Sequence, residues 1–177
     1  MTKRKVLKKD FFEQKTLIVA EQLIGKFLVR KGSAYMITET EAYDGFHDKA
    51  SHASRGMTPR NKVMFGSAGV WYVYFVYGMH HMLNVVTGPE EYPAAVLIRA
   101  VEGIKGPARL TKKLEVDKSI NEQTLSQKTG LWIEDRGIAV AKRQIQKTPR
   151  IGVVYAGPIW AGKNWRFVLK DDDCKKK

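Results

Sequence analysis

The sequence predicts a single domain of the mixed α/β (α+β) class, in which strands outnumber helices. The chain has 177 residues, of which 44% are hydrophobic, and this suits one domain with a core of ordinary size. Most apolar stretches are short and rich in β-branched and aromatic residues, as strands are, whereas only two stretches have helical features. We place the domain at residues 6–170, between charged tails at 1–5 and 171–177.

The two helices are predicted from periodicity and from end signals. In residues 15–26 apolar side chains recur at helical spacing, with Thr16 as a candidate N-cap and Gly25 as a stop. In residues 106–116, Pro107 suits the first helical position.

Strands are predicted where apolar stretches lie between turn residues. They fall at residues 26–30, 34–43, 94–102, 150–157 and 165–169, and at 69–88, where Gly78 divides a β-hairpin. Residues 44–61 form a long polar loop with Gly45, Gly56 and Pro59. A loop of that length in a small domain is usually functional or disordered.

The charge of the chain predicts a polyanionic partner. Lys and Arg number 31 and Asp and Glu 18, a net charge of +13. Nucleic acid or a membrane surface would suit that balance, and a surface of solvated lysines without a partner is the alternative. No apolar stretch is long enough to span a bilayer, and no apolar segment of a signal peptide follows the basic start. The lone Cys174 fits a reducing compartment, so we expect a cytoplasmic protein.

Several classes of enzyme site lack their motifs. No G-x-G-x-x-G follows a strand and no P-loop is present. The four histidines do not combine with cysteine at a zinc spacing, and the pattern of zinc-dependent nucleobase deaminases is missing. We therefore expect no metal and no cofactor.

The stretch "ITETEAYDG" places two acidic residues in a predicted strand. Alternation puts Ile37, Glu39, Glu41 and Tyr43 on one face, with Glu41 and Tyr43 about 7 Å apart along the strand. A carboxylate beside an aromatic ring could line a pocket that holds a flat ring and performs chemistry next to it. A hydrated outer face is the alternative.

The hairpin carries an unusual density of aromatic residues. Tyr72 and Tyr74 share one face, whereas Trp71, Phe75 and Tyr77 share the other, and most of these rings should be core. The tip, Tyr77-Gly78-Met79, is the part where burial is least expected. It could act as a wedge between stacked bases, or it could be an ordinary turn.

Two further strands contain a polar residue among apolar ones. Arg99 in "LIRAV" needs a partner if it is buried, and Glu41 is the obvious candidate. A surface arginine on an edge strand is the alternative. Asn84 in "MLNVV" reads, from the residues alone, as a side-chain amide with satisfied hydrogen bonds.

A series of motifs resembles one known family. "ETEAYDG", "SHASRGMTPRN", "YVYFVYGMHHMLNVV", "AVLIRAVE", "GPARL" and "RIGVVYAG" follow one another in this order. Together they resemble the alkyladenine (3-methyladenine) DNA glycosylases of the mammalian type, which also occur in bacteria. The resemblance extends from about Phe11 to about Phe167. It implies a curved antiparallel sheet as the core, flanking helices, and a β-hairpin that protrudes into the DNA minor groove.

The resemblance also implies roles for individual residues. Glu41 would be the base that activates water, with Arg99 helping to hold that water and a phosphate. The proposed roles of the other residues concern the base pocket (Tyr43, His52, Tyr74 and Asn84), intercalation into DNA (Tyr77 and Met79), and support of the loop or contact with the DNA backbone (Arg60 and Asn61).

The implied reaction is hydrolysis of the N-glycosidic bond of an alkylated or deaminated purine in double-stranded DNA. It would leave an abasic site and need no cofactor, membrane or obligate protein partner, so we expect a monomer associated with the bacterial nucleoid. The alternative is a basic, β-rich nucleic-acid-binding module without catalysis, in which Glu41 is only a surface charge.

Overall fold

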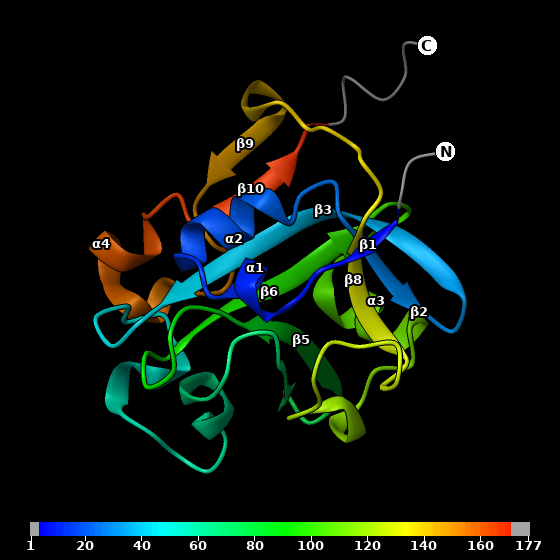
Figure 1. Cartoon of the computed structure of the whole chain (residues 1–177). Helices are drawn as coiled ribbons and strands as arrows, with labels where there is room; N and C mark the ends of the chain where they lie inside the picture. The colour runs from blue at the N-terminus through cyan, green and yellow to red at the C-terminus, as the bar shows by residue number, and fades with distance from the viewer. Residues whose placement is uncertain (1–3, 171–177) are drawn as a thin grey trace.

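The computed structural model describes residues 4–170, and the strands paired in that part of the chain run antiparallel. The strands are β1 (Lys5–Val6), β2 (Phe27–Arg30), β3 (Ser33–Asp44), β4 (Trp71–Val76), β5 (His80–Val86), β6 (Ala94–Val101), β7 (Ile104–Lys105), β8 (Leu131–Asp135), β9 (Ile145–Thr148) and β10 (Arg166–Leu169). Their order is β1-β8-β2-β3-β6-β5-β4, with β10 joining β3 to β9 and with β7 beside β6. The sheet curls strongly around the core (Figure 1), which confirms the predicted fold class.

The long strand β3 organises this sheet. Its first residues pair with β2, and its later residues pair with β6 on one side and β10 on the other. The register with β6 shifts between Ile37 and Glu39 and shifts back between Glu39 and Thr40, so the pairing is irregular there. As a result Ile37, Thr40 and Ala42 are buried on the core side, where the Thr40 hydroxyl donates to the carbonyl of Ala20 at 2.8 Å.

The same irregularity corrects one prediction. Ile37 does not share a face with Glu39, Glu41 and Tyr43, because the bulge shifts the alternation of side chains between residues 37 and 40. Glu39, Glu41 and Tyr43 lie on the face opposite the core, and there they meet the segment around residues 148–151 and β10. Glu41 and Tyr43 are two residues apart on one strand and therefore point to the same face, which brings the carboxylate next to the ring.

Four short α-helices accompany the sheet within residues 4–170. They are α1 (Lys9–Phe12), α2 (Thr16–Gln22), α3 (Pro107–Lys113) and α4 (Gly157–Ala161). Pro107 begins α3 as predicted. The helix predicted over 15–26 is shorter, and Thr16 is not its N-cap: Lys15 occupies that position, and the Thr16 hydroxyl donates to Asp44 at 2.8 Å.

The strand predicted at residues 150–157 is absent. Residues 154–156 form a 3₁₀ turn instead, and α4 follows directly. Gly152 and Gly157 both adopt positive φ (78° and 79°), which turns the chain twice within this stretch. The apolar residues that suggested a strand are mostly exposed, and Val154 is 84% exposed.

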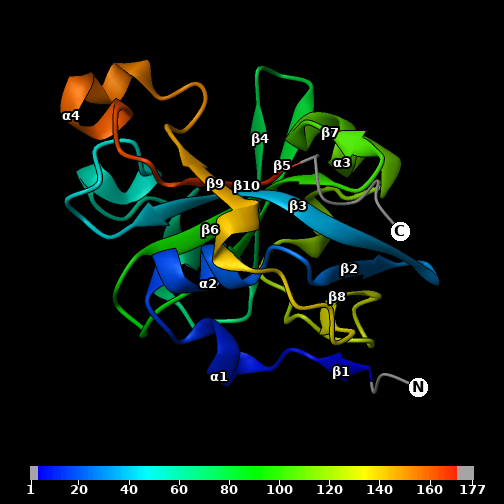
Figure 2. The same cartoon turned by 90° about the horizontal axis from the view of Figure 1, so that it is seen from above.

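The predicted hairpin is present as β4 and β5, with Trp71 opposite Val85 and Val76 opposite His80. It projects from the sheet on the side where α4 lies (Figure 2). Trp71 is fully buried and donates its indole N–H to the carbonyl of Leu131 at 3.1 Å, so the base of the hairpin is anchored in the core.

Strands β8 and β9 fall in stretches for which we predict no strand. β8 lies between β1 and β2, and β9 pairs with β10. Of the expected tails, residues 1–3 and 171–177 lie outside the described residues, whereas Lys5 belongs to β1 and pairs with Asp135.

Candidate active site

A narrow slot opens between β3, the β4–β5 hairpin and the loop that follows β3. Its lining residues are Tyr43, Ala50, Ser51, His52, Met64, Tyr72, Tyr74, Asn84, Ala95 and Tyr155. The four residues predicted for a base pocket, Tyr43, His52, Tyr74 and Asn84, are all among them. The structure therefore brings together residues that are up to 41 positions apart in the sequence (84 − 43 = 41).

Aromatic rings form much of this slot. The Tyr72 and Tyr74 rings lie 5.1 Å apart between centroids, and the His52 ring meets that of Tyr74 edge-on at 4.6 Å. Burial raises the pKa of both tyrosines above the ordinary value, so the phenols stay neutral at physiological pH. Such walls suit a flat, apolar or cationic ring system.

His52 and Asn84 are held by the hairpin strands. The His52 Nδ1 lies 3.0 Å from the Tyr72 hydroxyl, and Asn84 donates to the carbonyl of Tyr72 at 3.1 Å. Burial, and secondarily the charge of Arg60, lowers the pKa of His52 to about 4. The imidazole is therefore neutral near pH 7.

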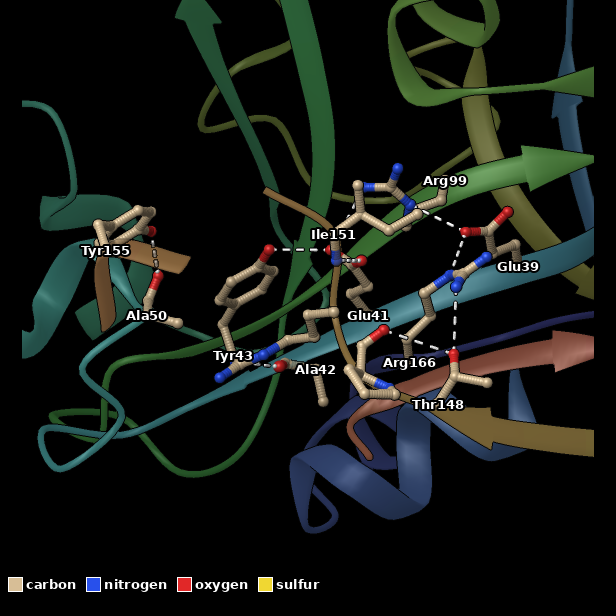
Figure 3. A network of polar contacts seen from close by, with 12 residues as sticks. Glu39, Glu41, Ala42, Tyr43, Ala50, Arg99, Thr148, Ile151, Tyr155 and Arg166 are labelled. Atoms are coloured by element: carbon tan, nitrogen blue, oxygen red, sulfur yellow. Dashed lines mark hydrogen bonds and ion pairs between the residues drawn. The ribbon is translucent and has the colours of Figure 1, made fainter. Parts of the chain in front are cut away.

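Glu41 is fully buried next to the slot; it does not line the slot itself but contacts Tyr43, which does (Figure 3). Its carboxylate accepts hydrogen bonds from the backbone N–H of Ile151 at 2.8 Å and from the Tyr43 hydroxyl at 2.9 Å. The Arg99 guanidinium lies 3.4 Å away. A buried carboxylate needs such partners, because leaving it without them would cost several kcal/mol.

The pKa of Glu41 is raised above the ordinary glutamate value. Desolvation by burial is the main cause, and Arg99, the Ile151 N–H and the Tyr43 hydroxyl offset it in part. A carboxylate with a raised pKa is a stronger base than an exposed one, which suits proton abstraction from water.

Arg99 is not a surface arginine, and its shorter contact is to a second glutamate. Its Nε donates to Glu39 at 2.9 Å, and Glu39 also accepts from Arg166 Nε at 2.6 Å. Arg99 thus links the two glutamates of β3, and Arg166 on β10 neutralises Glu39. The predicted contact with Glu41 is present at a longer distance.

Arg150 and Asp48 form a buried ion pair that the sequence analysis missed. The two guanidinium nitrogens of Arg150 lie 2.6 and 2.8 Å from the Asp48 oxygens, and both side chains are 0% exposed. Arg150 also donates to the carbonyl of Ala42 at 2.8 Å and stacks on the Tyr43 ring at 4.9 Å. The pair therefore fixes Tyr43 and residue 151, both of which contact Glu41. Because the two residues lie in separate loops far apart in the sequence, no regular spacing indicates that they pair.

The tip of the hairpin is the most exposed aromatic part of this face. Tyr77 is 85% exposed and Met79 is 67% exposed. Tyr77 and Gly78 both have positive φ, 52° and 66°, which makes the turn tight and directs the Tyr77 side chain outward. The tip residues do not line the slot, so the structure separates them from the pocket residues.

Arg60 and Asn61 both hold protein segments in place. Arg60 donates to the carbonyl of Phe75 at 3.0 Å and its guanidinium lies over the Tyr74 ring at 5.3 Å. Asn61 is buried and donates to the carbonyls of His52 and Gly56 at 2.9 and 3.0 Å. Arg60 therefore supports the hairpin, and Asn61 closes the loop that carries His52.

Residues 4–170 contain neither a metal-binding cluster of side chains nor a membrane-spanning helix. No group of three or more His, Cys, Asp or Glu side chains there could hold a metal ion. No helix in that range is long and apolar enough to cross a membrane.

Comparison with known sequences gives consistent results. A sequence profile described as methylpurine-DNA glycosylase matches residues 10–105 and 103–173. A relative from Methanocella arvoryzae, named "Putative 3-methyladenine DNA glycosylase", is 44% identical, with 97% of this chain and 96% of the relative aligned. Relatives with the same name from Prosthecochloris aestuarii and Sodalis glossinidius are 48% and 41% identical, covering 93% and 94% of this chain and 88% and 98% of theirs.

Proposed function

The chain belongs to the methylpurine-DNA glycosylase family, whose members are hydrolases of N-glycosyl bonds in DNA, and from this premise we propose which lesions and residues the reaction uses. The protein flips an alkylated or deaminated purine out of duplex DNA and hydrolyses its N-glycosidic bond with a water activated by Glu41. The substrates are of the 3-methyladenine, 7-methylguanine, hypoxanthine and ethenoadenine class. The protein acts as a monomer and leaves an abasic site. Family membership favours this enzyme over a non-catalytic binding module.

One observation carries the assignment of the chemistry. Glu41 is a fully buried carboxylate that hydrogen-bonds to Tyr43, a wall of the aromatic slot. A purine that stacks on Tyr43 brings its sugar toward this acid. Burying an acid usually costs stability even when the acid is paired. A role in the reaction accounts for its position.

The slot binds the extruded base by stacking. The purine lies between Tyr43 and Tyr74, with His52 at its edge and Asn84 disfavouring guanine through the 2-amino group. Each stacked base gains about 1–3 kcal/mol, which offsets a flipping cost of a few kcal/mol. A purine that carries positive charge after alkylation binds best, because the tyrosine faces are electron-rich.

The hydrolysis follows from the placement of Glu41. The C1′–N bond breaks as the bonding electron pair moves to the purine nitrogen and an oxocarbenium-like sugar develops. Water adds to C1′ while Glu41 accepts a proton from it, and the carboxylate charge stabilises the cationic sugar. Arg99 helps to position that water and a phosphate. Cationic purines leave as neutral bases, whereas hypoxanthine leaves only with an added proton.

The activity can be tested with duplex oligonucleotides that each carry one lesion. After incubation, alkali cleaves the strand wherever a base has been removed. We expect cleavage at the lesion and no cleavage of an undamaged duplex. Because the mechanism uses water and no lysine amine, borohydride should trap no covalent protein–DNA adduct. Tight binding without base release from any of the four lesions would contradict the proposal.

The rate should fall in acid with a midpoint above the ordinary glutamate pKa. Protonated Glu41 cannot accept a proton, and desolvation raises its pKa, so the protonated form appears at higher pH than usual. Single-turnover excision of 3-methyladenine, measured from about pH 4 to pH 8, checks this. 3-Methyladenine is suited to the test because its departure needs no acid. A rate independent of pH across this range would contradict a role for Glu41 as base.

Replacing the hairpin tip should impair excision from duplex more than from single strands. Tyr77 fills the gap left by the extruded base and Met79 lies against neighbouring pairs, so Tyr77→Ser removes that filling. A loss of about 1.4 kcal/mol would reduce duplex excision about tenfold. Single-turnover rates on matched duplex and single-stranded oligonucleotides measure the difference. Phe75→Ala, which changes an exposed ring of the same hairpin outside the tip, is the control. Equal losses on both substrates would speak against the wedge.

A further inference from the structure

A second, larger and more open depression lies directly beside the aromatic slot. Its lining residues are Lys49, Ser51, His52, Ser54, Arg55 and Tyr155. Three of them, Ser51, His52 and Tyr155, also line the slot, so the two hollows share a rim. Tyr155 stands at this rim with 70% of its surface exposed, and its hydroxyl donates to the carbonyl of Ala50 at 2.8 Å.

The depression carries positive charge that no acid neutralises. Lys49 and Arg55 are exposed, and within residues 4–170 neither forms an ion pair or a side-chain hydrogen bond. No Asp or Glu is among the lining residues. Asp48, the acid next to Lys49 in the sequence, is buried and engaged by Arg150. The hydroxyls of Ser51 and Ser54 add neutral polar groups.

The backbone beneath these side chains is fixed by several hydrogen bonds. Asp48 accepts from the N–H of Ala50 at 3.1 Å, and the Ser51 hydroxyl oxygen accepts from the N–H of Ala53 at 3.2 Å. Asn61 holds the carbonyl of His52 from the other side. Two cations on a fixed loop lose less entropy on binding than two on a mobile one, which favours a defined anion site.

From this arrangement we infer that Lys49 and Arg55 bind a backbone phosphate of the damaged strand, next to the flipped nucleotide. The inference rests on the proposed function for the position of that nucleotide. A base held in the slot has its strand continuing on both sides of the slot's mouth. The depression with Lys49 and Arg55 shares the slot's rim. It therefore lies where a phosphodiester of that strand must pass. Lysine and arginine suit this ligand, and such contacts fix register without reading sequence.

The test compares the salt dependence of DNA binding. Each neutralised phosphate contributes about −0.9 to the slope of log K against log salt concentration on duplex DNA. The Lys49→Ala/Arg55→Ala variant should show a slope shallower by about 0.9, because the two cations bind the same phosphate. Lys5→Ala/Lys128→Ala removes the same charge from the β1–β8 side, far from the slot, and should leave the slope unchanged.

Replacing single phosphates of the DNA by an uncharged linkage locates the phosphate that Lys49 and Arg55 contact. In a lesion-containing duplex, single phosphates are replaced one at a time by methylphosphonate, and binding by the unmodified protein and by the variant is compared. We expect at least one position beside the lesion where the unmodified protein loses affinity and the variant does not. An unchanged salt slope, or equal losses for both proteins at every position, would overturn the inference. Inorganic phosphate should compete only weakly with the duplex, and competition at equal concentrations would also overturn it.

This outcome is separable from that of the proposed function. Binding is measured without base release, so the phosphate site can be present in a protein that removes no base. Suppose, conversely, that the unmodified protein excises methylated purines while the Lys49→Ala/Arg55→Ala variant binds DNA with an unchanged salt slope. That result would support the proposed function and refute the phosphate site.

Discussion

Replacing Glu41 with glutamine should slow single-turnover excision by roughly 10²–10⁴-fold, the usual contribution of a general base. Glutamine has nearly the same shape: its oxygen can still accept from the Ile151 N–H, and its NH₂ group, in the place of the other carboxylate oxygen, can donate to the Tyr43 hydroxyl oxygen. It cannot take a proton from water, and it offers no charge to the developing cationic sugar. Rapid-quench measurement on a duplex with one lesion gives the rate constant of the chemical step.

The same substitution should not destabilise the fold near neutral pH. The raised pKa of Glu41 means that the folded state favours its protonated form, so stability from this group is present at low pH and is lost as pH rises through the folded pKa. A neutral glutamine avoids that loss, and Arg99 keeps Glu39 as its partner. Unfolding by denaturant should therefore give a free energy equal to or above that of the unmodified protein. A large drop in stability would mean that the loss of activity reflects misfolding.

Removing the acid of the buried ion pair should be the most damaging change to stability. Asp48→Ala leaves the Arg150 guanidinium buried without a counter-charge, and breaking such a pair typically costs about 3–5 kcal/mol. Denaturant titration with linear extrapolation measures the change in the free energy of unfolding. Asp48→Asn, which keeps hydrogen-bond acceptance, should cost less than Asp48→Ala.

A double variant tests whether the destabilisation by Asp48→Ala comes from leaving the Arg150 charge buried without a partner. Asp48→Leu/Arg150→Met replaces both charges by apolar groups, and it should be more stable than Asp48→Ala alone. It should still be impaired in excision, because Arg150 no longer supports Tyr43 or holds residue 151 against Glu41. If Asp48→Ala changed the unfolding free energy by less than about 1 kcal/mol, the ion pair would not be the structural support inferred here.

Local patterns in the sequence predicted the parts of the fold that depend on short-range rules. The hairpin follows from alternating aromatic and β-branched residues around Gly78, and α3 from Pro107 at its start. The helix predicted over 15–26 ends at Gln22 with Leu23 as its C-cap, before Gly25, the predicted stop, where the chain turns with a φ of 86°.

The failures have a common physical origin in tertiary contacts. Residues 150–157 have a strand-like composition, but Arg150 is held by Asp48 and the Ile151 N–H by Glu41, partners more than 100 residues away in the sequence. The bulge in β3 depends on its pairing with β6, and alternation within one strand cannot reveal it. Long-range ion pairs and bulges leave no spacing signal in a single sequence.

The candidate site likewise contains some residues that local sequence patterns indicate and some contacts that only the folded chain reveals. Glu41, Tyr43 and Tyr74 stand out because an acid among strand residues and a dense run of rings are unusual. Their assembly with His52 and Asn84 was expected only from the family resemblance, and the structure places all four pocket residues in one slot. The Arg99–Glu39 contact and the Arg150–Asp48 pair became visible only in the folded chain.

The central claim is that Glu41 performs the chemistry on a base that is already flipped. It is tested most directly by a duplex with a lesion that the unmodified protein excises and a fluorescent 2-aminopurine beside it, whose emission rises when its neighbour leaves the stack. Stopped-flow fluorescence should show the same flipping phase for the unmodified protein and for Glu41→Gln, followed by base release only in the former. Base release by Glu41→Gln at an undiminished rate would contradict the claim.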